Sequence, residues 1–590
     1  HPTNPRHEKT TGSISPAKTT IASKVGKSAD CPERPSVERG PRHGTARSPA
    51  EGPVLHRMRP YSGQVSTNTG AANGSTSEPT APKQRIGLVF AGLLVAMLLG
   101  SLDQMVFSTA LPTIVGELHG VEHMLWVTTA YLVASTIMMP IYGKVGDLVG
   151  HKWIYLGALA IFLVGSVIGG LAPSMVWLIV GRAVQGIGGG GLMILSQAII
   201  ADVVPVRERS KYMGLMGGVF GVASVVGPLL GGWFTSGIGW RWAFWMNLPL
   251  GLLAMILAAV FLKAPGRRSE LKLDVWGIVT MAAAVTSVIL VTSWGGTTFA
   301  WTSWVIIGLV AVAVCSTVAL VWVERRAAEP ILPPHLFTSR NFVLATLAGM
   351  ALGVAMFGTV SYLPTYLQMV TGVSATESGL MMVAMIGGLI IMATLTGQLA
   401  ARTGRYKWMP ILGMVVMAIA LALMSTLTTS SSVTLIVFYL FLVGVGIGLG
   451  QQILVLIVQN AFPDSEVGTA TAANNFFREI GASLGGAAVG AIFTSRLTAL
   501  LAERLPSGST VDVNSLTPAS LKTFTDAVRT VVVGAYNDAL TPIFLMLVPL
   551  IVVGLVLAIS LKEVPLRTSH DTSNAADSAE LTEATEANPT

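Results

Sequence analysis

The sequence predicts an all-α, polytopic membrane protein of two similar six-helix halves, with two further helices inserted between them. The composition is 52% hydrophobic and only 11% charged, against roughly 25% charged residues in a soluble domain. Apolar stretches of the roughly 20 residues needed to cross a bilayer recur along most of the chain. Landmarks of the first half also return in the second half at nearly constant spacing.

The repeat rests on three landmarks that recur 252 to 258 positions apart. They are Leu111-Pro112-Thr113 with Leu363-Pro364-Thr365, the loop 143–150 with 397–404, and Gly186, Gly188 and Gly190 with Gly444, Gly446 and Gly448. Two similar halves are the usual architecture of a membrane transporter, whose substrate path runs between them near the bilayer midplane. The ionisable residues differ between the halves, because Asp103 aligns with Ala355 and Arg182 with Leu440.

We expect about fourteen membrane spans, in the order in which the apolar stretches occur. They lie at 86–111, 125–143, 153–172, 176–200, 212–236, 242–262, 274–294, 302–323, 342–368, 377–400, 409–428, 432–458, 467–494 and 540–561. The repeat assigns 86–262 and 342–561 to the two halves. The linker 263–341 then carries the inserted pair, and 495–539 forms a long polar loop outside the cell.

The net charge of +7 comes entirely from residues 1–85, which carry 13 Lys and Arg against 6 Asp and Glu. This segment is rich in Pro, Ser, Thr and Gly, so we expect a disordered cytoplasmic tail. It either holds the N-terminus inside or makes a specific lipid or protein contact. Basic residues such as Lys144, Arg207 and Arg402 also favour loops on the tail's side, which predicts a cell-membrane protein with both termini cytoplasmic. The acidic segment 562–590 would be a second disordered cytoplasmic tail.

Several classes of chemistry are not expected. The two cysteines, Cys31 in the tail and Cys315 in a span, are not placed to pair, and the sequence shows no metal-ligand cluster. We expect no metal site, no cofactor and no nucleic-acid partner. Nucleophile-elbow and phosphate-loop patterns are lacking, and no loop is large enough for a catalytic domain, which argues against an enzyme.

Asp103 is the sharpest candidate, because it lies well inside the first predicted span. A carboxylate there costs roughly 2.5–3.5 kcal/mol on insertion scales, so it should face a functional path. We favour a role in loading and releasing a proton. The alternatives are a structural carboxylate paired with Arg182 or bonded to hydroxyls, and direct contact with substrate.

Arg182 lies early in the fourth span, and Gln185 follows one turn later on the same face. Arginine does not titrate in proteins, so Arg182 can bias and hold a nearby carboxylate but cannot carry the proton. We favour an interior position for Arg182. In the alternative, its long side chain reaches back to the membrane surface.

Three further motifs stand out. Gly227, Pro228, Gly231 and Gly232 predict a kinked fifth span with close helix approach, suited to a pivot or seal, although a pure packing motif looks the same. In the loop 143–152, Asp147 could cap a neighbouring helix, or the loop could simply follow the positive-inside rule. Arg478 and Glu479 lie inside a late span, where they could bind substrate, serve a second coupling step or form a structural pair.

These motifs together resemble the major facilitator superfamily, and within it the fourteen-span drug:proton antiporters of the QacA/EmrB type. The resemblance covers about residues 86–561. It rests on Gly143, Asp147, Gly150 and Lys152 in the signature loop, Arg182, Gln185 and Gly186 in the fourth span, Gly227, Pro228, Gly231 and Gly232 in the fifth, and Leu102, Asp103, Ala110, Leu111 and Pro112 in the first. His151 departs from the commonest form of the signature loop.

The resemblance implies proton-driven export of hydrophobic or amphipathic compounds by a monomer that alternates access across the bilayer. In the family, the fourth-span signature that Arg182, Gln185 and Gly186 match is associated with proton transfer. The same fold and coupling would also suit export of a lipid, a siderophore or an endogenous metabolite. A membrane-embedded enzyme, a passive channel and a sensor are the competing classes.

Overall fold

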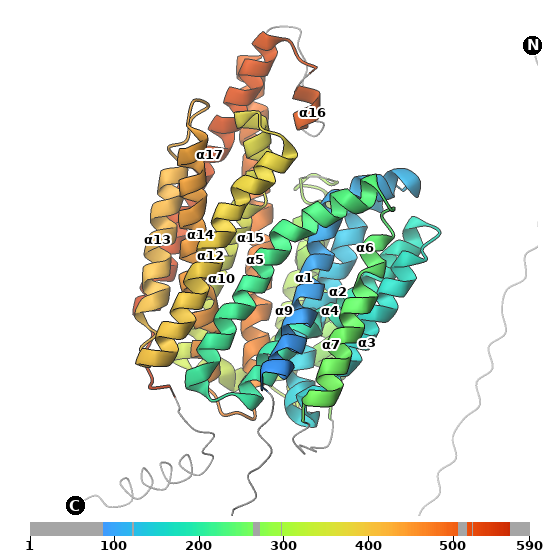
Figure 1. Cartoon of the computed structure of the whole chain (residues 1–590), viewed down its shortest axis with the longest axis vertical. Coiled ribbons are helices and arrows are strands. Elements are labelled where there is room, and N and C mark those ends of the chain that lie inside the picture. The colour runs from blue at the N-terminus through green and yellow to red at the C-terminus, as the bar shows by residue number, and fades with distance from the viewer. Residues whose placement is uncertain are drawn as a thin grey trace, which may run out of the picture. The chain divides into compact units, whose positions relative to one another are not determined.

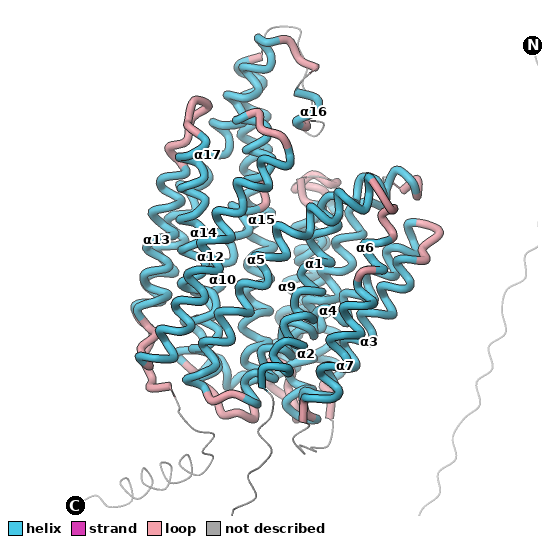
Figure 2. The backbone as a smooth tube through the Cα atoms, viewed as in Figure 1, coloured by secondary structure: helices cyan, strands magenta, loops and turns pink. Residues whose placement is uncertain are grey.

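The computed structural model describes residues 86–120, 123–263, 272–296, 298–505, 516–521 and 523–566. The chain is helical through most of these residues, and they contain no named β-strand (Figure 2). The predicted disordered tail 1–85 lies outside them, as does most of the predicted acidic tail 562–590.

The N-terminal half consists of five long helices, a single-turn helix and a final shorter helix. They are α1 (Ile86–Glu117), α2 (Met124–Val149), α3 (His151–Gly170), α4 (Met175–Val203), α5 (Val206–Ser236), α6 (Trp242–Trp245) and α7 (Asn247–Phe261). α1 continues through Pro112 and ends six residues beyond the predicted span 86–111. It therefore carries Asp103 near its centre.

The inserted pair and the C-terminal half follow in chain order. The pair is α8 (Val275–Trp294) and α9 (Trp304–Glu324), joined to the second half through η2 (Pro334–Thr338). The second half contains α10 (Arg340–Val360), α11 (Leu363–Tyr366), η3 (Leu367–Thr371), α12 (Ala375–Thr403), α13 (Trp408–Met424), α14 (Val433–Asn460), α15 (Val467–Arg504), α16 (Pro518–Leu521) and α17 (Asp526–Ile559). Several starts carry side-chain caps, including Asp274 on α8 and a Ser374–Glu377 capping box on α12.

The predicted fold class is confirmed. Among the described residues, thirteen helical segments are long and apolar enough to cross a membrane, and α13 is a shorter apolar helix. Its 17 residues span roughly 26 Å at about 1.5 Å per residue, close to the thickness of a hydrocarbon core. Each of the fourteen predicted spans coincides with one of these segments.

The predicted long loop 495–539 is wrong in its extent. α15 continues to Arg504 and α17 already begins at Asp526, so helix replaces both ends of that loop. Leu497 and Leu501 are buried in the same cluster as Tyr536, and Arg504 pairs with Asp538 at 2.7 Å. Charged residues mark the end of an apolar span in the sequence. The helix itself continues beyond them as long as its apolar face stays covered by other side chains.

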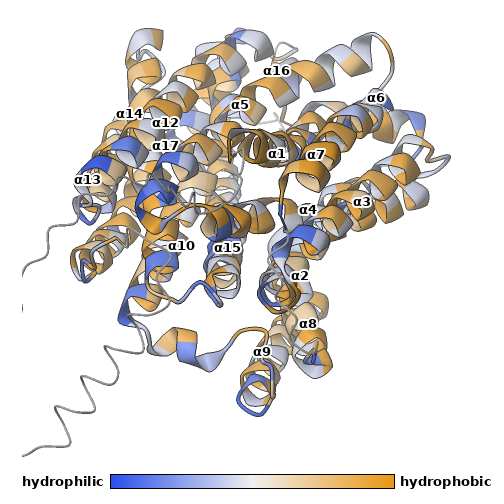
Figure 3. Ribbon diagram, turned by 60° about the horizontal axis from the view of Figure 1, so that its bottom comes forward, coloured by the Kyte–Doolittle hydropathy of each residue, from blue (hydrophilic) through white to orange (hydrophobic). Residues whose placement is uncertain are grey.

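The two halves meet mainly where α5 packs on α12 (Figure 1) and α2 packs on α15, with smaller contacts of α5 with α14 and of α4 with α15. The inserted α8 packs against α2 and α15, so the insert covers the second of these pairs (Figure 3). Most side chains of α9 are exposed, and Ile306 and Glu324 are its two buried residues. α9 therefore presents an apolar surface suited to lipid.

One end of the helical unit contains the start of α1 and the end of α17 (Figure 1). We call this end the tail side. Close glycine contacts join the halves there. A Cβ atom on Gly214 of α5 would overlap the Ala393 carbonyl of α12, and one on Gly397 would overlap the Ser210 carbonyl. Further along α5, Gly227 instead packs on Met105 of α1, within the same half. The halves are thus closed against each other on the tail side.

The glycine contacts predict a sharp difference between two alanine substitutions in the α12–α14 pair. A Cβ atom on Gly444 would overlap the Met385 carbonyl oxygen, whereas one on Gly387 meets nothing within 4 Å. Gly444→Ala should destabilise the protein by about 1–3 kcal/mol, because backbone must move to admit the methyl group. Thermal unfolding of the purified protein measures this, with Gly387→Ala as the matched control. Equal melting temperatures for the two variants would contradict this packing.

Candidate functional site

A buried polar cluster surrounds Asp103 in the N-terminal half. Asp103, Gln185 and Asn247 have no exposed surface, and Arg182 is 2% exposed. Arg182 donates a hydrogen bond to Oδ2 of Asp103. Oδ1 accepts from Gln185 Nε2 at 3.0 Å and from Asn247 Nδ2 at 2.8 Å. Since every one of these neighbours is a donor, the cluster suits an ionised carboxylate.

Ser166 of α3 completes the cluster. Its Oγ accepts from Gln185 Nε2 at 2.8 Å and from Asn247 Nδ2 at 3.1 Å, and it donates to the Phe162 carbonyl at 3.1 Å. The two amides are thereby held in position to face the carboxylate. Four helices contribute side chains to one connected network: α1, α3, α4 and α7.

Glycine contacts explain why these helices lie so close. A Cβ atom on Gly165 of α3 would overlap the Gln185 backbone, and one on Gly181 of α4 would lie 2.7 Å from the Gly169 nitrogen. The same holds for Gly186, whose Cβ would lie 2.5 Å from the Tyr131 carbonyl oxygen of α2. Small residues let backbones approach in a membrane protein, which here places the polar side chains within hydrogen-bond distance.

Arg182 is also held by two aromatic rings. Its guanidinium carbon lies 4.3 Å from the ring centroid of Phe107 and 4.3 Å from that of Tyr131. Nη1 additionally donates to Gln185 Oε1 at 2.9 Å. The interior position expected for Arg182 is therefore confirmed, and the alternative in which it reaches the membrane surface is wrong.

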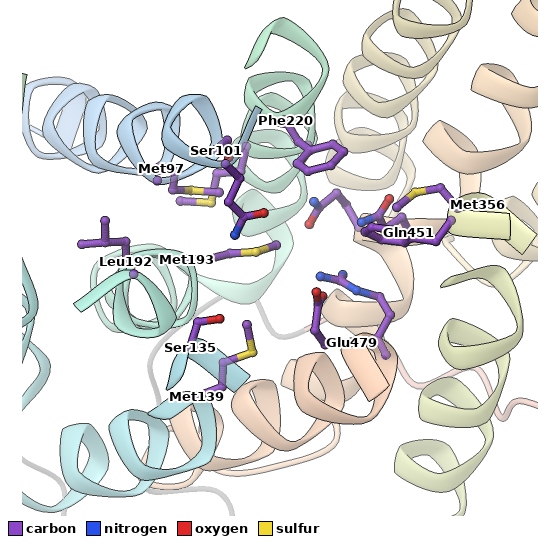
Figure 4. Close-up of a pocket in the computed structure, with 18 of the residues that line it drawn as sticks. Met97, Ser101, Ser135, Met139, Leu192, Met193, Phe220, Met356, Gln451 and Glu479 are labelled. Atoms are coloured by element: carbon purple, nitrogen blue, oxygen red, sulfur yellow. The ribbon is translucent and has the colours of Figure 1, made fainter. Parts of the chain in front are cut away.

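A cavity lies between the two halves beside this cluster (Figure 4). Tyr131 and Gln104 line it, whereas Asp103 is fully buried and is not among the lining residues. Methionine, aromatic and amide side chains dominate the wall. The lining includes Met97, Met139, Met193, Met216 and Met356, Phe220 and Phe357, and Gln104, Gln451 and Gln452.

Arg478 and Glu479, which the sequence singled out, both line this cavity from α15. Glu479 is labelled in Figure 4. Among the described residues, no hydrogen bond or ion pair within 4 Å joins them, and Arg478 Nη1 is buried without a hydrogen-bond partner. The geometry therefore does not match the close structural pair that was one of the predicted alternatives. One guanidinium and one carboxyl group are thus available to the cavity.

The fifth-span motif packs α5 against the α1 segment that carries Asp103. A Cβ atom on Gly227 would overlap Met105, and one on Gly231 would lie 2.5 Å from the Val106 carbonyl oxygen. The Pro228 carbonyl accepts a hydrogen bond from Thr109 at 3.2 Å. The expected close approach is wrong for Gly232, whose Cβ would meet nothing within 4 Å.

On the tail side, Asp147 reaches across the two halves and caps α15. Its carboxylate accepts from the Gly468 nitrogen at 3.1 Å, and from both the nitrogen and Oγ1 of Thr469 at 2.6 Å. A carboxylate at a helix N-terminus is favourable because it satisfies free N–H groups and the helix dipole. The sequence had offered this cap as one interpretation of the loop, and the structure confirms it.

The rest of the signature loop supports this contact. A Cβ atom on Gly143 would lie 2.7 Å from the Gly468 carbonyl oxygen, so the glycine lets α2 and α15 touch. Gly150 adopts a φ of 101°, a conformation that side chains other than hydrogen resist. Lys152 Nζ donates to the Ala259 carbonyl at 2.9 Å, away from the cap. The loop residues thus divide between the inter-half contact and the turn that presents it.

The sequence alone did not place Ser166, Asn247, His151 or Asp202 in a site. Ser166 is a lone hydroxyl in an apolar span, a weak signal because such hydroxyls commonly bond their own helix, as this one also does. His151 lies between Asp147 and Asp202, with Nδ1 2.6 Å from Asp202 Oδ2. Only the fold brings α3 and α4 together so that these side chains meet.

Comparison with known proteins identifies the class. The sequence profile of the Major Facilitator Superfamily matches residues 93–486. The chain belongs to this superfamily, and it is a multi-pass membrane transporter rather than an enzyme.

Relatives and solved structures agree with this assignment. An uncharacterised MFS-type transporter of Mycobacterium tuberculosis is 41% identical over 509 residues, covering 84% of this chain and 74% of the relative. The multidrug transporter protein MdtP of Bacillus subtilis is 38% identical over 418 residues, covering 71% and 77%. The solved proton:xylose symporter XylE matches with a TM-score of 0.52 and 14% identity, over 83% of this chain and 98% of that one, and supports the fold alone.

The buried pair predicts that two substitutions compensate each other. Arg182→Gln leaves the Asp103 carboxylate buried without its cation and should cost about 3–5 kcal/mol of stability. Adding Asp103→Asn removes the uncompensated charge, so the double variant should regain much of that loss. Thermal unfolding of the wild type, both single variants and the double variant measures the coupling. Strictly additive losses would show that Asp103 and Arg182 do not stabilise each other.

Proposed function

We propose that this transporter exports hydrophobic and amphipathic compounds in exchange for protons, by alternating access between its two halves. Several relatives are named for this kind of activity: the multidrug transporter protein MdtP and multidrug resistance protein 3 of Bacillus subtilis, and the efflux pump aunC of Aspergillus niger. The cavity between the halves suits such compounds, since its methionines and aromatic rings offer adaptable apolar contacts.

Coupling between substrate and proton depends on the position of Tyr131. Tyr131 stacks on Arg182, the partner of Asp103, and also lines the cavity. A substrate that moves Tyr131 therefore acts on the ion pair without touching the carboxylate. This arrangement supports a proton site and a substrate site that communicate through a shared aromatic ring.

The proton step follows from the donors around Asp103. In the tail-closed conformation the ionised carboxylate is held by Arg182, Gln185 and Asn247. A proton arriving from the opposite side neutralises Asp103 and leaves Arg182 without its counterion. Oδ1 of Asn247 is buried without a donor among the described residues, so rotation of this amide lets it accept the new O–H of Asp103.

Loss of the ion pair loosens the hold of α1 on α4, and the halves rock to open the tail side. Substrate then enters the cavity, displaces Tyr131 and favours renewed pairing of Arg182 with ionised Asp103. The proton leaves on the tail side and the closed arrangement returns. Each charge that moves down the membrane potential supplies about 2.3 kcal/mol per 100 mV.

Orientation in the cell membrane belongs to the same proposal. Basic residues concentrate on the tail side, where they join the halves. Arg207 donates to the carbonyls of Ala401 and Arg402, each at 2.9 Å, and Arg209 pairs with Asp464 at 3.0 Å. The positive-inside rule then puts the tail side and both termini in the cytoplasm.

The coupling proposal predicts that efflux requires both Asp103 and the proton gradient. Cells producing the wild type should expel ethidium and a neutral lipophilic dye faster than vector cells, and a protonophore should abolish the difference. Asp103→Asn should reduce both dyes to the vector rate, because it cannot exchange a proton. Asp526→Asn removes an exposed carboxylate at the start of α17 and serves as the matched control.

Efflux by Asp103→Asn at the wild-type rate would contradict proton coupling at this residue. If neither dye moves faster than in vector cells despite confirmed membrane expression, broad drug export is wrong. Lipids, siderophores and metabolites would then be tested as cargo.

Glu479 should make the transporter favour positively charged substrates over neutral ones. Its carboxylate lines the cavity and is free to meet a cationic group. Glu479→Gln should lower ethidium efflux several-fold and leave the neutral dye unchanged, since only the cation loses an electrostatic partner. Initial efflux rates measure this, with the exposed Glu503→Gln as control. Equal losses for both dyes would assign Glu479 to coupling or structure instead of cargo recognition.

A further inference from the structure

A second buried charged cluster lies on the tail side, centred on His151. This residue opens α3, is 2% exposed, and lies between carboxylates on two other helices. Nδ1 is 2.6 Å from Asp202 Oδ2 of α4, and Nε2 is 3.4 Å from Asp147 Oδ1 of α2. Nε2 has no hydrogen-bond partner among the described residues.

The same Asp147 oxygen holds the other half of the protein. Oδ1 accepts from the Gly468 nitrogen at 3.1 Å, in the first turn of α15. A Cβ atom on Gly468 would lie 2.6 Å from this oxygen and 2.7 Å from His151 Nε2. The imidazole, the carboxylate and the helix start therefore meet at one point of the inter-half contact.

The protonation state of His151 decides the sign of its interaction with Asp147. The Asp202 carboxylate only accepts, so the Nδ1 that faces it at 2.6 Å must carry a proton. In neutral imidazole Nε2 then bears a lone pair 3.4 Å from the Asp147 oxygen, and the two acceptors repel each other. In imidazolium the positive charge of the ring attracts the same oxygen. Protonation thus replaces two opposed acceptors with a charge-assisted contact.

We propose that His151 is a positioning residue for Asp147, and that protonation of its imidazole strengthens closure of the tail side. Closure is favoured at acidic pH and weakens as the tail-side compartment becomes alkaline. The physiological consequence rests on the proposed function. An antiporter that admits protons to the cytoplasm slows when that compartment is already acidic, because its tail side stays shut.

The neighbouring charges do not take over this role. On the elements packed around His151, Asp147 and Asp202 are the carboxylates within ion-pair distance. The other tail-side charges have partners elsewhere: Lys144 with Glu329 at 2.7 Å, Lys152 with the Ala259 carbonyl at 2.9 Å, Arg209 with Asp464 at 3.0 Å, and Glu466 with His335 at 2.9 Å. Imidazole ordinarily titrates at about pH 6.5, within the physiological range.

The test is a distance measurement across the tail side. Spin labels at Lys263→Cys, after α7, and Arg405→Cys, between α12 and α13, report the separation of the halves in lipid nanodiscs. Cys31→Ser and Cys315→Ser remove the native thiols. Pulsed electron resonance is recorded from pH 5.5 to 8.5, with Asp103 present and with Asp103→Asn, so that titration of Asp103 is separated from that of His151.

The short-distance population should grow as the pH falls. Its ratio to the long-distance population should change by about tenfold for each unit by which the imidazole pKa differs between the closed and open states. His151→Gln should abolish this dependence, and His151→Arg should keep the short distance throughout the range. His335→Gln removes the exposed tail-side histidine and should leave the dependence unchanged.

Distances independent of pH in the parent protein would overturn the proposal. So would His151→Gln retaining the parental dependence, or His335→Gln abolishing it. None of these readings requires transport, so failure of dye efflux in cells would count against the proposed function alone.

Discussion

A charged carboxylate in the middle of a membrane-spanning helix is tolerated only where donors surround it, and much of the N-terminal half meets that requirement at Asp103. α4 supplies Arg182 and Gln185, α7 supplies Asn247, and α3 supplies Ser166. The glycines that bring α3 and α4 into backbone contact serve the same end, because they let these donors come within hydrogen-bond distance. The ion pair is therefore as much a packing constraint as a chemical group, and neutralising it changes how these helices hold together.

The two halves share a fold but contribute different functional groups. The N-terminal half contains the sealed carboxylate, whereas the C-terminal half contributes Arg478 and Glu479 to the open cavity. Tyr131 belongs to both environments. Contact between the halves is concentrated on the tail side, where Asp147 of one half caps a helix of the other. A transporter needs a contact of this kind that holds well but can be released, and a side-chain cap of backbone N–H groups meets both conditions.

The fold could be predicted because membrane spans are recognised from composition and long-range repeats from the spacing of recurring residues. The position of Asp103 and Arg182 was equally visible, since charges in apolar spans are rare. Ser166 and His151 were not recognised, because one resembles an ordinary helical hydroxyl and the other a loop residue until α3, α4 and α15 are packed together. The extension of α15 to Arg504 was missed for a related reason: hydropathy marks where an apolar span ends, whereas the helix continues as long as Leu497 and Leu501 remain covered.

We propose that substrate in the cavity changes the protonation of Asp103 through Tyr131 and Arg182. The most direct measurement is proton release on adding ethidium to the purified protein in weakly buffered solution with a pH indicator. The wild type should release protons and Asp103→Asn should release none, although the variant still binds the dye. Equal release from both proteins, or binding to the wild type without release at any pH, would contradict this coupling.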